Sequence, residues 1–336
     1  LTGAVYATTV NATATAAVAA DDGDTIAFSG AVTATTFNAL GAGTVTLAED
    51  LTAAVVFGAN SNTTGTISVA ADKKIVGAVT TAITNEGILT FANSTTDTTL
   101  VSGAVGVAAT PKVLHKVNAG AATGVTATFA DAVSATTVTT AGAGTTKFSG
   151  LVTATTINAD GTGTLDSDAG LTAAVVFGAD GTIDMAAGKI LIGSAQTDTT
   201  DTGTLTFATH TADGTIVVNN GATGTSSTNR LKALNISVNN TATTASQATH
   251  TGAAYAKTIT ADASVATDTI QFSGVVNADT LNLDGAGTFT LNGDVTAAVV
   301  VSGDSTTTVA ADKKIVGAVT NDGTSGEGAL VFTTTT

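Results

Sequence analysis

The sequence predicts an all-β protein, a β-solenoid with a strand about every ten residues, and three observations lead to this prediction. Short segments alternate apolar residues with threonine, as in Thr44-Val45-Thr46-Leu47. Glycine, asparagine and aspartate turn signals separate these segments, and the chain consists of long internal repeats. β-Branched residues favour strands, whereas glycine at this density destabilises helices.

The composition limits the fold and the function classes. Threonine, alanine and glycine make up roughly half of the 336 residues, only 11% are charged, and there is no tryptophan. A conventional enzyme core needs large side chains, which are scarce here. An ordinary disordered chain is also excluded, because 43% of the residues are hydrophobic and the mean hydropathy is +0.37. We therefore expect a regular stack of strands that buries small side chains.

The charge indicates where the protein acts. The formal net charge is −15 and the sequence pI is about 4.2, which opposes binding to nucleic acid and to anionic lipid. The absence of cysteine removes disulfides, thiolate metal sites and cysteine nucleophiles. No apolar run reaches the roughly 20 residues of a membrane helix, and no leader pattern follows Leu1. We expect an extracellular or cell-surface protein without a transmembrane segment.

A long repeat organises the chain. Its markers are Phe28 with Gly30, Phe148 with Gly150, and Phe272 with Gly274, at spacings of 120 and 124 residues. The segment AADKKIVGAVT at 70–80 returns unchanged at 310–320. We expect one continuous repeat array over 1–336, with copies at approximately 28–147 and 148–271 and a partial copy at 272–336. Residues 1–27 then complete a preceding copy.

A shorter period lies within each copy. In the first copy we expect strands at Thr25–Phe28, Thr35–Asn38, Thr44–Leu47, Ala54–Phe57, Thr66–Val69, Lys74–Gly77, Gly87–Thr90 and Thr98–Val101. Coils of two strands take about 20 residues and coils of three about 30, and both remain open. The alternative is a series of tandem β-sandwich domains, which would require larger inward residues.

The copies diverge most between Phe91 and Phe148 and between Phe207 and Phe272. These two stretches contain Pro111, all three histidines and several basic residues. We interpret them as joints between repeat units.

Four strings carry a resemblance to a known family. They are LTAAVVFGA at 51–59, ADKKIVGAVT at 71–80, GTLTF at 203–207 and LNLDGAGTFTLNGDVTAAVV at 281–300. In these strings the chain resembles the passenger regions of rickettsial outer-membrane protein B-like autotransporters, and it shares their cadence with bacterial surface-layer repeat proteins. The resemblance implies a β-solenoid that is displayed as a surface coat or adhesin.

Candidate sites are few. Asp21, Asp22 and Asp24 form the best calcium candidate, because hard cations need several oxygen ligands, although a solvated acidic turn is the more ordinary interpretation. His115, His210 and His250 lack a partner at metal-ligand spacing, and we expect them at the surface or in turns.

The sequence contains no nucleophile, phosphate-binding or dinucleotide motif, and we assign no catalytic or cofactor-binding residue. We expect a non-enzymatic extracellular structural protein, a repeat subunit or segment of a bacterial surface layer, fibre or adhesin that assembles end to end with copies of itself. One alternative is a binding module, either an adhesin for host or environmental surfaces or an ice-binding face of outward threonines. A less favoured alternative is a carbohydrate-active β-helix, which requires carboxylates that converge on one groove.

Overall fold

The computed structural model describes residues 1–14, 24–59, 63–108, 112–212, 214–240, 245–322 and 328–334. Within these residues the protein is all-β without a helix, and its parallel strands stack as a β-solenoid of about 13 turns. The predicted fold class is therefore confirmed. The chain divides into two compact units, Leu1–Ala173 and Ala174–Thr336, which are described separately.

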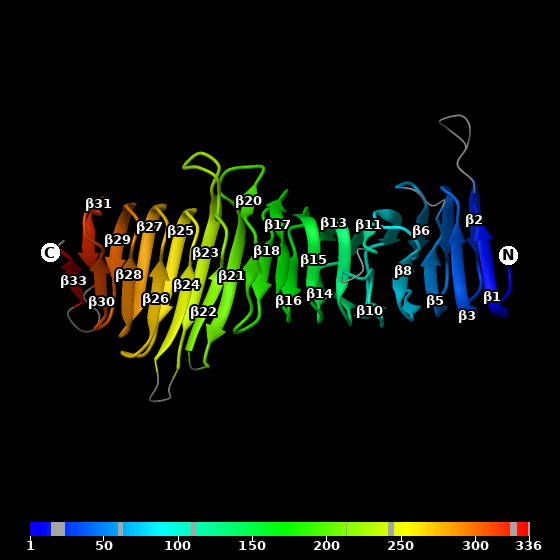
Figure 1. Cartoon of the computed structure of the whole chain (residues 1–336), viewed down its shortest axis with the longest axis horizontal. Helices are drawn as coiled ribbons and strands as arrows, with labels where there is room; N and C mark the ends of the chain where they lie inside the picture. Colours follow the sequence, from blue (N-terminus) through cyan, green and yellow to red (C-terminus); the bar gives the residue numbers. More distant parts are fainter. Residues whose placement is uncertain are drawn as a thin grey trace. The chain divides into compact units, whose positions relative to one another are not determined.

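Two parallel sheets form the first unit (Figure 1). One sheet contains β1 (Val5–Thr13), β3 (Val32–Leu40), β5 (Leu51–Phe57), β7 (Ile75–Val76), β8 (Val79–Thr81), β10 (Thr98–Val101), β12 (Thr126–Phe129), β14 (Thr145–Phe148) and β16 (Thr164–Ser167). The other contains β2 (Thr25–Phe28), β4 (Thr44–Leu47), β6 (Thr66–Val69), β9 (Glu86–Phe91), β11 (Leu114–Ala121), β13 (Val133–Gly142) and β15 (Val152–Ala159). β17 (Leu171–Phe177) crosses the boundary between the units.

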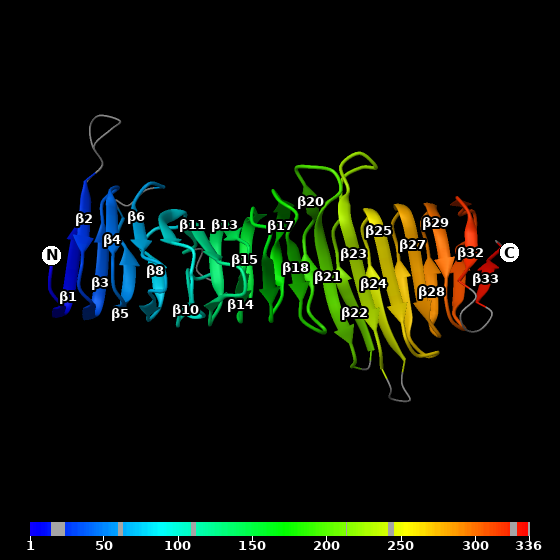
Figure 2. The same cartoon turned by 180° about the vertical axis from the view of Figure 1, so that it is seen from behind.

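The second unit also has two parallel sheets (Figure 2). One contains β18 (Thr182–Met185), β21 (Thr202–His210), β23 (Leu231–Val238), β25 (Ala254–Ala263), β27 (Val276–Gly285), β29 (Val295–Val301), β31 (Ile315–Val316) and β32 (Val319–Asn321). The other contains β19 (Leu191–Ile192), β20 (Ala195–Thr197), β22 (Gly214–Asn219), β24 (Ser246–His250), β26 (Thr269–Phe272), β28 (Thr288–Leu291), β30 (Thr306–Val309) and β33 (Ala329–Phe332).

Alternation along each strand fills the core. In β4, Val45 and Leu47 are buried while Thr44 and Thr46 face outward. The next turn repeats the pattern in register, so that Val45 lies beside Ile67. Columns of apolar side chains thus run through each unit, and the backbone of each turn bonds to the next. The tandem β-sandwich alternative is wrong, because successive turns pair in parallel within one stack.

The four-residue strands were predicted with their full bounds, whereas the longer strands were predicted too short. β3 extends over Val32–Leu40 rather than Thr35–Asn38. The register between β3 and β5 shifts between Thr33 and Thr36, and such an irregularity interrupts the alternation on which the prediction relied. β8 was missed, since Gly77 separates it from β7 by only a short break in the strand.

Equivalent strands of successive copies lie in opposite sheets. In the first unit, the strands that follow Phe28-Ser29-Gly30 and Phe148-Ser149-Gly150 are β3 and β15, which belong to different sheets. In the second unit, β20 and its equivalent β32 are likewise in different sheets. One copy therefore contains an odd number of crossings from sheet to sheet, and each motif appears on alternate faces.

The sheet that contains the longer strands also changes along the chain. In the first unit β9 pairs on one edge with the four-residue strand β6 and on the other with the eight-residue strand β11. In the second unit β21 similarly lies between β18, with four residues, and β23, with eight. These changes occur where the divergent segments begin, whereas the two compact units divide between Ala173 and Ala174, outside both segments.

Glycines allow the turns to approach closely at the corners. A column in the second unit consists of Gly193, Gly221, Gly252, Gly274 and Gly293. A Cβ atom on any of the last four would collide with the carbonyl oxygen of the preceding glycine. Much of the glycine content is thus explained by backbone contact between turns rather than by flexibility.

Candidate functional site

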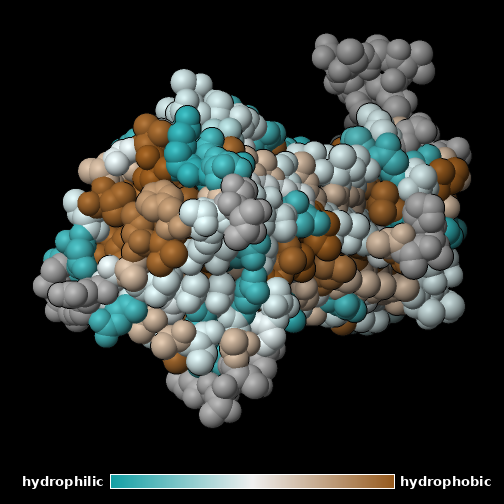
Figure 3. Space-filling model, turned by 60° about the vertical axis from the view of Figure 1, so that its left-hand side comes forward, coloured by the Kyte–Doolittle hydropathy of each residue, from teal (hydrophilic) through white to brown (hydrophobic). Residues whose placement is uncertain are grey.

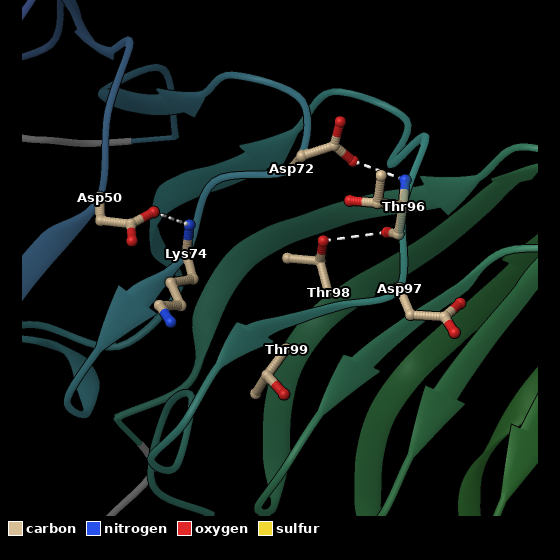
Figure 4. A pocket seen from close by; sticks show the side chains of 7 residues that line it. All are labelled: Asp50, Asp72, Lys74, Thr96, Asp97, Thr98 and Thr99. Atoms are coloured by element: carbon tan, nitrogen blue, oxygen red, sulfur yellow. Dashed lines mark hydrogen bonds between the residues drawn. The ribbon is translucent and has the colours of Figure 1, made fainter.

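A polar groove of about 380 Å³ lies at one corner of the first unit (Figure 4). Its lining consists of Asp50, Asp72, Lys74 and the segment Thr96, Asp97, Thr98 and Thr99. These residues come from three successive turns, just before β5, just before β7 and at β10. The stacking of corners therefore gathers three carboxylates that are far apart in the sequence.

Asp72 is held in the left-handed region at φ 61°, and its carboxylate accepts several hydrogen bonds. Oδ1 accepts the N–H of Thr95 at 2.6 Å and that of Thr96 at 2.8 Å, and Oδ2 accepts the Thr95 hydroxyl. The Thr95 hydroxyl bond and these backbone bonds lower the pKa of Asp72 to about 2. Asp72 therefore remains ionised and fastens the turn that contains Thr95.

The other two carboxylates of the groove also bind backbone in the following turn. Asp50 Oδ1 accepts the Lys74 N–H at 3.1 Å, and Asp97 Oδ1 accepts the Thr126 N–H at 2.7 Å. In the second unit Asp294 accepts the Lys314 N–H in the same way, at 3.3 Å. Corner aspartates thus link one turn to the next.

At Asp72 this arrangement differs from a glycosidase-type acid–base pair. A glycosidase-type pair needs one carboxyl that is kept protonated by a raised pKa. The pKa of Asp72 is lowered instead, and burial raises the pKa of Glu86, which begins β9 and does not line the groove. The groove can hold a polar molecule against Lys74 and the threonine hydroxyls, but its three carboxylates already accept hydrogen bonds from backbone N–H groups.

A second candidate is a buried polar cluster in the second unit. His250 Nε2 lies 2.8 Å from Thr223 Oγ1 and 3.3 Å from Asn219 Nδ2, and Asn219 Nδ2 donates to Thr223 Oγ1 at 3.0 Å. His250 Nδ1 lies 3.1 Å from the Gly252 carbonyl oxygen. Burial lowers the pKa of His250 to about 4, so that the imidazole is neutral at pH 7.

The hydroxyl and imidazole of this cluster resemble a nucleophile and its base, but a substrate has no access to them. Asn219, Thr223 and His250 are all fully buried. The cluster is therefore a core network in which the polar groups satisfy one another. The expectation that the histidines lie at the surface is wrong for His250, and also for His210, which is 8% exposed.

Ion pairs also join adjacent turns in both units. Arg230 Nε lies 2.7 Å from Asp201, and its two terminal nitrogens lie 2.6 and 2.9 Å from the Asp279 carboxylate. Lys232 pairs with Asp180 at 2.7 Å. In the first unit Lys147 pairs with Asp168 at 2.9 Å and with Asp166 at 3.2 Å. Basic residues therefore also serve as links between turns.

The proposed calcium cluster is only partly described. Asp21 and Asp22 lie outside the described residues. Asp24 is exposed, and its backbone carbonyl accepts the Thr44 N–H at 2.9 Å. Among the residues that the structure describes, no group of three or more histidine, aspartate or glutamate side chains could hold a metal ion.

The repeat markers have structural positions. Phe28, Phe148 and Phe272 are at most 3% exposed and point into the core. Gly30, Gly150 and Gly274 follow at the corner, where a side chain would meet the backbone of the preceding turn. The markers thus identify one repeating element, a short strand that ends in a buried phenylalanine and a close-packed corner.

Outward threonines form short rows. In the second unit Thr288 and Thr290 of β28 lie in register with Thr306 and Thr308 of β30. The row through Thr288 continues to Thr269, whereas the row through Thr290 continues to Gln271. A regular threonine array is therefore present, and it is limited in extent.

No protein-family model, no curated protein and no solved structure matches this chain. The resemblance to autotransporter passengers and surface-layer proteins thus stays a prediction. Within the described ranges, the structure contains no helix of sufficient length and apolar character to span a membrane.

Proposed function

We propose that this protein is a non-enzymatic structural scaffold of a bacterial surface layer, fibre or adhesin, which copies of the chain build by joining end to end. The observation that carries the proposal is that polar side chains throughout both units bind adjacent turns. Asp72, Asp97 and Arg230 are examples. Residues of this kind strengthen a stack rather than form a reaction centre.

The sequence supports an extracellular location for this scaffold. The chain is acidic, lacks cysteine and resembles displayed passenger regions. Partners are then other copies of the chain and, in the adhesin form, a host or environmental surface.

Electron microscopy of the purified chain over a concentration series, together with size-exclusion chromatography, tests the proposal. We expect rods or filaments whose length increases with concentration. Monodisperse monomers at high concentration would contradict end-to-end assembly.

The threonine array favours a second candidate function, binding to an ordered surface such as ice. Thr288, Thr290, Thr306 and Thr308 present four hydroxyl groups in two registered rows. A thermal-hysteresis measurement on wild type and on Thr290→Lys tests this function. Equal ice recrystallisation with and without the wild-type protein would exclude it.

A further inference from the structure

A carboxylate is fully buried in the second unit. Asp268 lies in the turn between β25 and β26 and is 0% exposed. Its Oδ2 accepts the Asn240 N–H at 3.0 Å, whereas its Oδ1 forms no hydrogen bond with any described residue. Figure 3 shows hydrophilic side chains on the surface of the second unit, whereas the Asp268 side chain is withdrawn from solvent.

No basic side chain of the described residues compensates this carboxylate. Asp268 takes part in none of the ion pairs of the described ranges, and Arg230 and Lys232 of the same unit bind other carboxylates. Residues 241–244, which follow Asn240 in the sequence, include no basic residue. A charge in the interior of a protein is normally paired or bound to a metal ion, because an isolated charge is costly to remove from water.

Neutral oxygen atoms lie beside Asp268 in the preceding turn. The parallel register of β24 and β26 places Ser246 next to Asp268. Ser246 is 0% exposed, and its hydroxyl donates to the Ala212 carbonyl and accepts Asn240 Nδ2 at 2.9 Å. A hydroxyl oxygen has two lone pairs, so Ser246 Oγ can still act as a ligand.

Main-chain oxygens lie on the other side of Asp268. The Asp268 N–H donates to the Val265 carbonyl at 2.9 Å. Gly287 takes the equivalent position in the following turn, and a Cβ atom there would meet the Ala263 methyl group and, at 2.7 and 2.9 Å, the carbonyl oxygens of Asp268 and Val265. The corner is therefore rich in oxygen atoms, which are the ligands that hard cations prefer.

The fold does not require a carboxylate at this position. The Asp268 carbonyl accepts the Thr288 N–H at 2.8 Å, and in the first unit the Gly144 carbonyl accepts the Thr164 N–H at 2.9 Å in the same way. A glycine thus suffices for the backbone. Asp24 is the equivalent of Asp268 in the first copy, since each precedes a segment Thr-Ile-x-Phe-Ser-Gly.

We propose that Asp268 binds one alkali cation, sodium or potassium, inside the second unit. Asp268 Oδ1 is the charged ligand, and hydroxyl and carbonyl oxygens of the same corner are the neutral ligands. One carboxylate balances one positive charge, whereas a divalent ion would leave an excess charge in the interior. The site is independent of end-to-end assembly.

Urea unfolding of the wild-type chain in sodium, potassium and tetramethylammonium chloride at equal ionic strength tests the site. Tetramethylammonium screens charges equally and is too large for a closed corner. We expect a higher unfolding midpoint in sodium or potassium chloride. Once the site is saturated, the folding equilibrium constant should rise about tenfold for each tenfold increase in the cation. Equal midpoints in the three salts would overturn the proposal.

Two variants separate the site from general salt effects. Asp268→Asn keeps the shape of the side chain and an acceptor for the Asn240 N–H, and it should abolish the difference between the salts. Asp262→Asn removes an equal charge from a half-buried side chain of β25 that accepts the Ser264 hydroxyl at 3.0 Å, and it should keep the difference. A difference that persists in Asp268→Asn, or that vanishes in both variants, contradicts the assignment.

Rubidium locates the ion without any substitution. A crystal of the wild-type chain grown in rubidium chloride should give an anomalous peak beside Asp268 Oδ1, and the absence of a peak there would overturn the site. Calcium chloride is the remaining arm of the unfolding experiment. Stabilisation by calcium without stabilisation by either alkali salt would overturn the assignment to a monovalent ion.

Discussion

The two divergent segments fill the same place in the coil with opposite chemistry. In the first unit Val101 pairs with Ile75 on one side and with Phe129 on the other. In the second unit Asn219 takes the place of Val101, between Leu191 and His250. All of these side chains are at most 1% exposed.

One further position in each segment, Val105 in the first unit and Thr223 in the second, completes the contrast. Val105 bridges the strands β8 and β13 in the first unit, and Thr223 bridges β20 and β25 in the second. The first unit thus has valine, valine and phenylalanine where the second has asparagine, threonine and histidine. Backbone stacking specifies the coil in both, and the side chains have only to fill the space and satisfy one another.

The largest expected effect comes from placing a histidine among the apolar residues Val101, Val105 and Phe129 of the first unit. Phe129 stacks on Phe148 at 5.0 Å and meets Phe91 edge-on at 6.0 Å. Phe129→His removes these contacts and buries an imidazole without the asparagine and threonine that surround His250. We expect a loss of about 3–5 kcal/mol in the free energy of unfolding, measured with urea.

Phe129→Leu is the matched control, because it keeps an apolar side chain and should cost less than Phe129→His. Equal losses for the two variants would show that the polar environment around His250 is not needed.

The second prediction concerns pH. The pKa of His250 is about 4 in the folded protein and about 6.5 when unfolded, so the unfolded chain binds the proton first. Stability should therefore fall as the pH decreases from about 6.5 to 4, by roughly 3 kcal/mol, and level off below that range. Asp72 in the first unit has a lowered pKa of about 2, so its contribution is lost only between about pH 4 and 2.

Urea unfolding at a series of pH values, on wild type and on His250→Phe, measures the difference. The variant should lose the dependence between pH 6.5 and 4 and keep the one at lower pH. An unchanged profile would contradict the assignment to His250.

The third prediction concerns the three buried polar residues Asn219, Thr223 and His250 together. His250→Phe alone removes the imidazole that contacts Asn219 and Thr223, so that within this set they keep only the bond to each other, and it should cost about 1–3 kcal/mol. The triple variant Asn219→Val, Thr223→Val and His250→Phe copies the first unit and should recover most of this loss, since the three polar side chains that contact one another are replaced together and the Gly221 N–H, which donates to Asn219 Oδ1 at 2.9 Å, is only part-buried. Chemical denaturation of the single and triple variants decides the matter, and a triple variant less stable than the single one would refute the equivalence of the two sets.

Much of the fold could be predicted from the sequence, but the burial of His250 among polar side chains could not. The repeat, the short strands and the divergent segments follow from motifs such as Phe28-Ser29-Gly30 and from alternation. The burial of His250 does not, because histidine in a segment with few repeat matches gives no inward or outward signal. The available signal was positional: Phe272, one turn later in the same column, is a repeat marker that points inward.

The groove of the first unit was missed for a related reason. Asp50, Asp72 and Asp97 line one groove because the corners of three successive turns lie beside one another. Spacing in the sequence cannot give this, since the copies differ in loop length and the number of sides per coil was open.

The smallest expected effect concerns an ion pair that the second unit has and the first unit lacks at the equivalent position. Asp201 and Asn85 are equivalent left-handed residues, at φ 59° and 61°. Asp201 pairs with Arg230 at 2.7 Å, whereas Asn85 lies 3.1 Å from His115 Nδ1. Arg230→Met should cost about 1 kcal/mol or less at low salt, because the partner carboxylates are partly exposed.

Salt should reduce that cost, since ions weaken the attraction between partly exposed charges, with a screening length of about 10 Å at 0.1 M. Screening also relieves the repulsion from a net charge of −15, so wild-type stability alone is ambiguous. The informative quantity is the difference between wild type and variant at low and at high salt. It should shrink for Arg230→Met and stay constant for His115→Met, and a constant difference for both would mean that Arg230 acts through the packing of its side chain rather than through its charge.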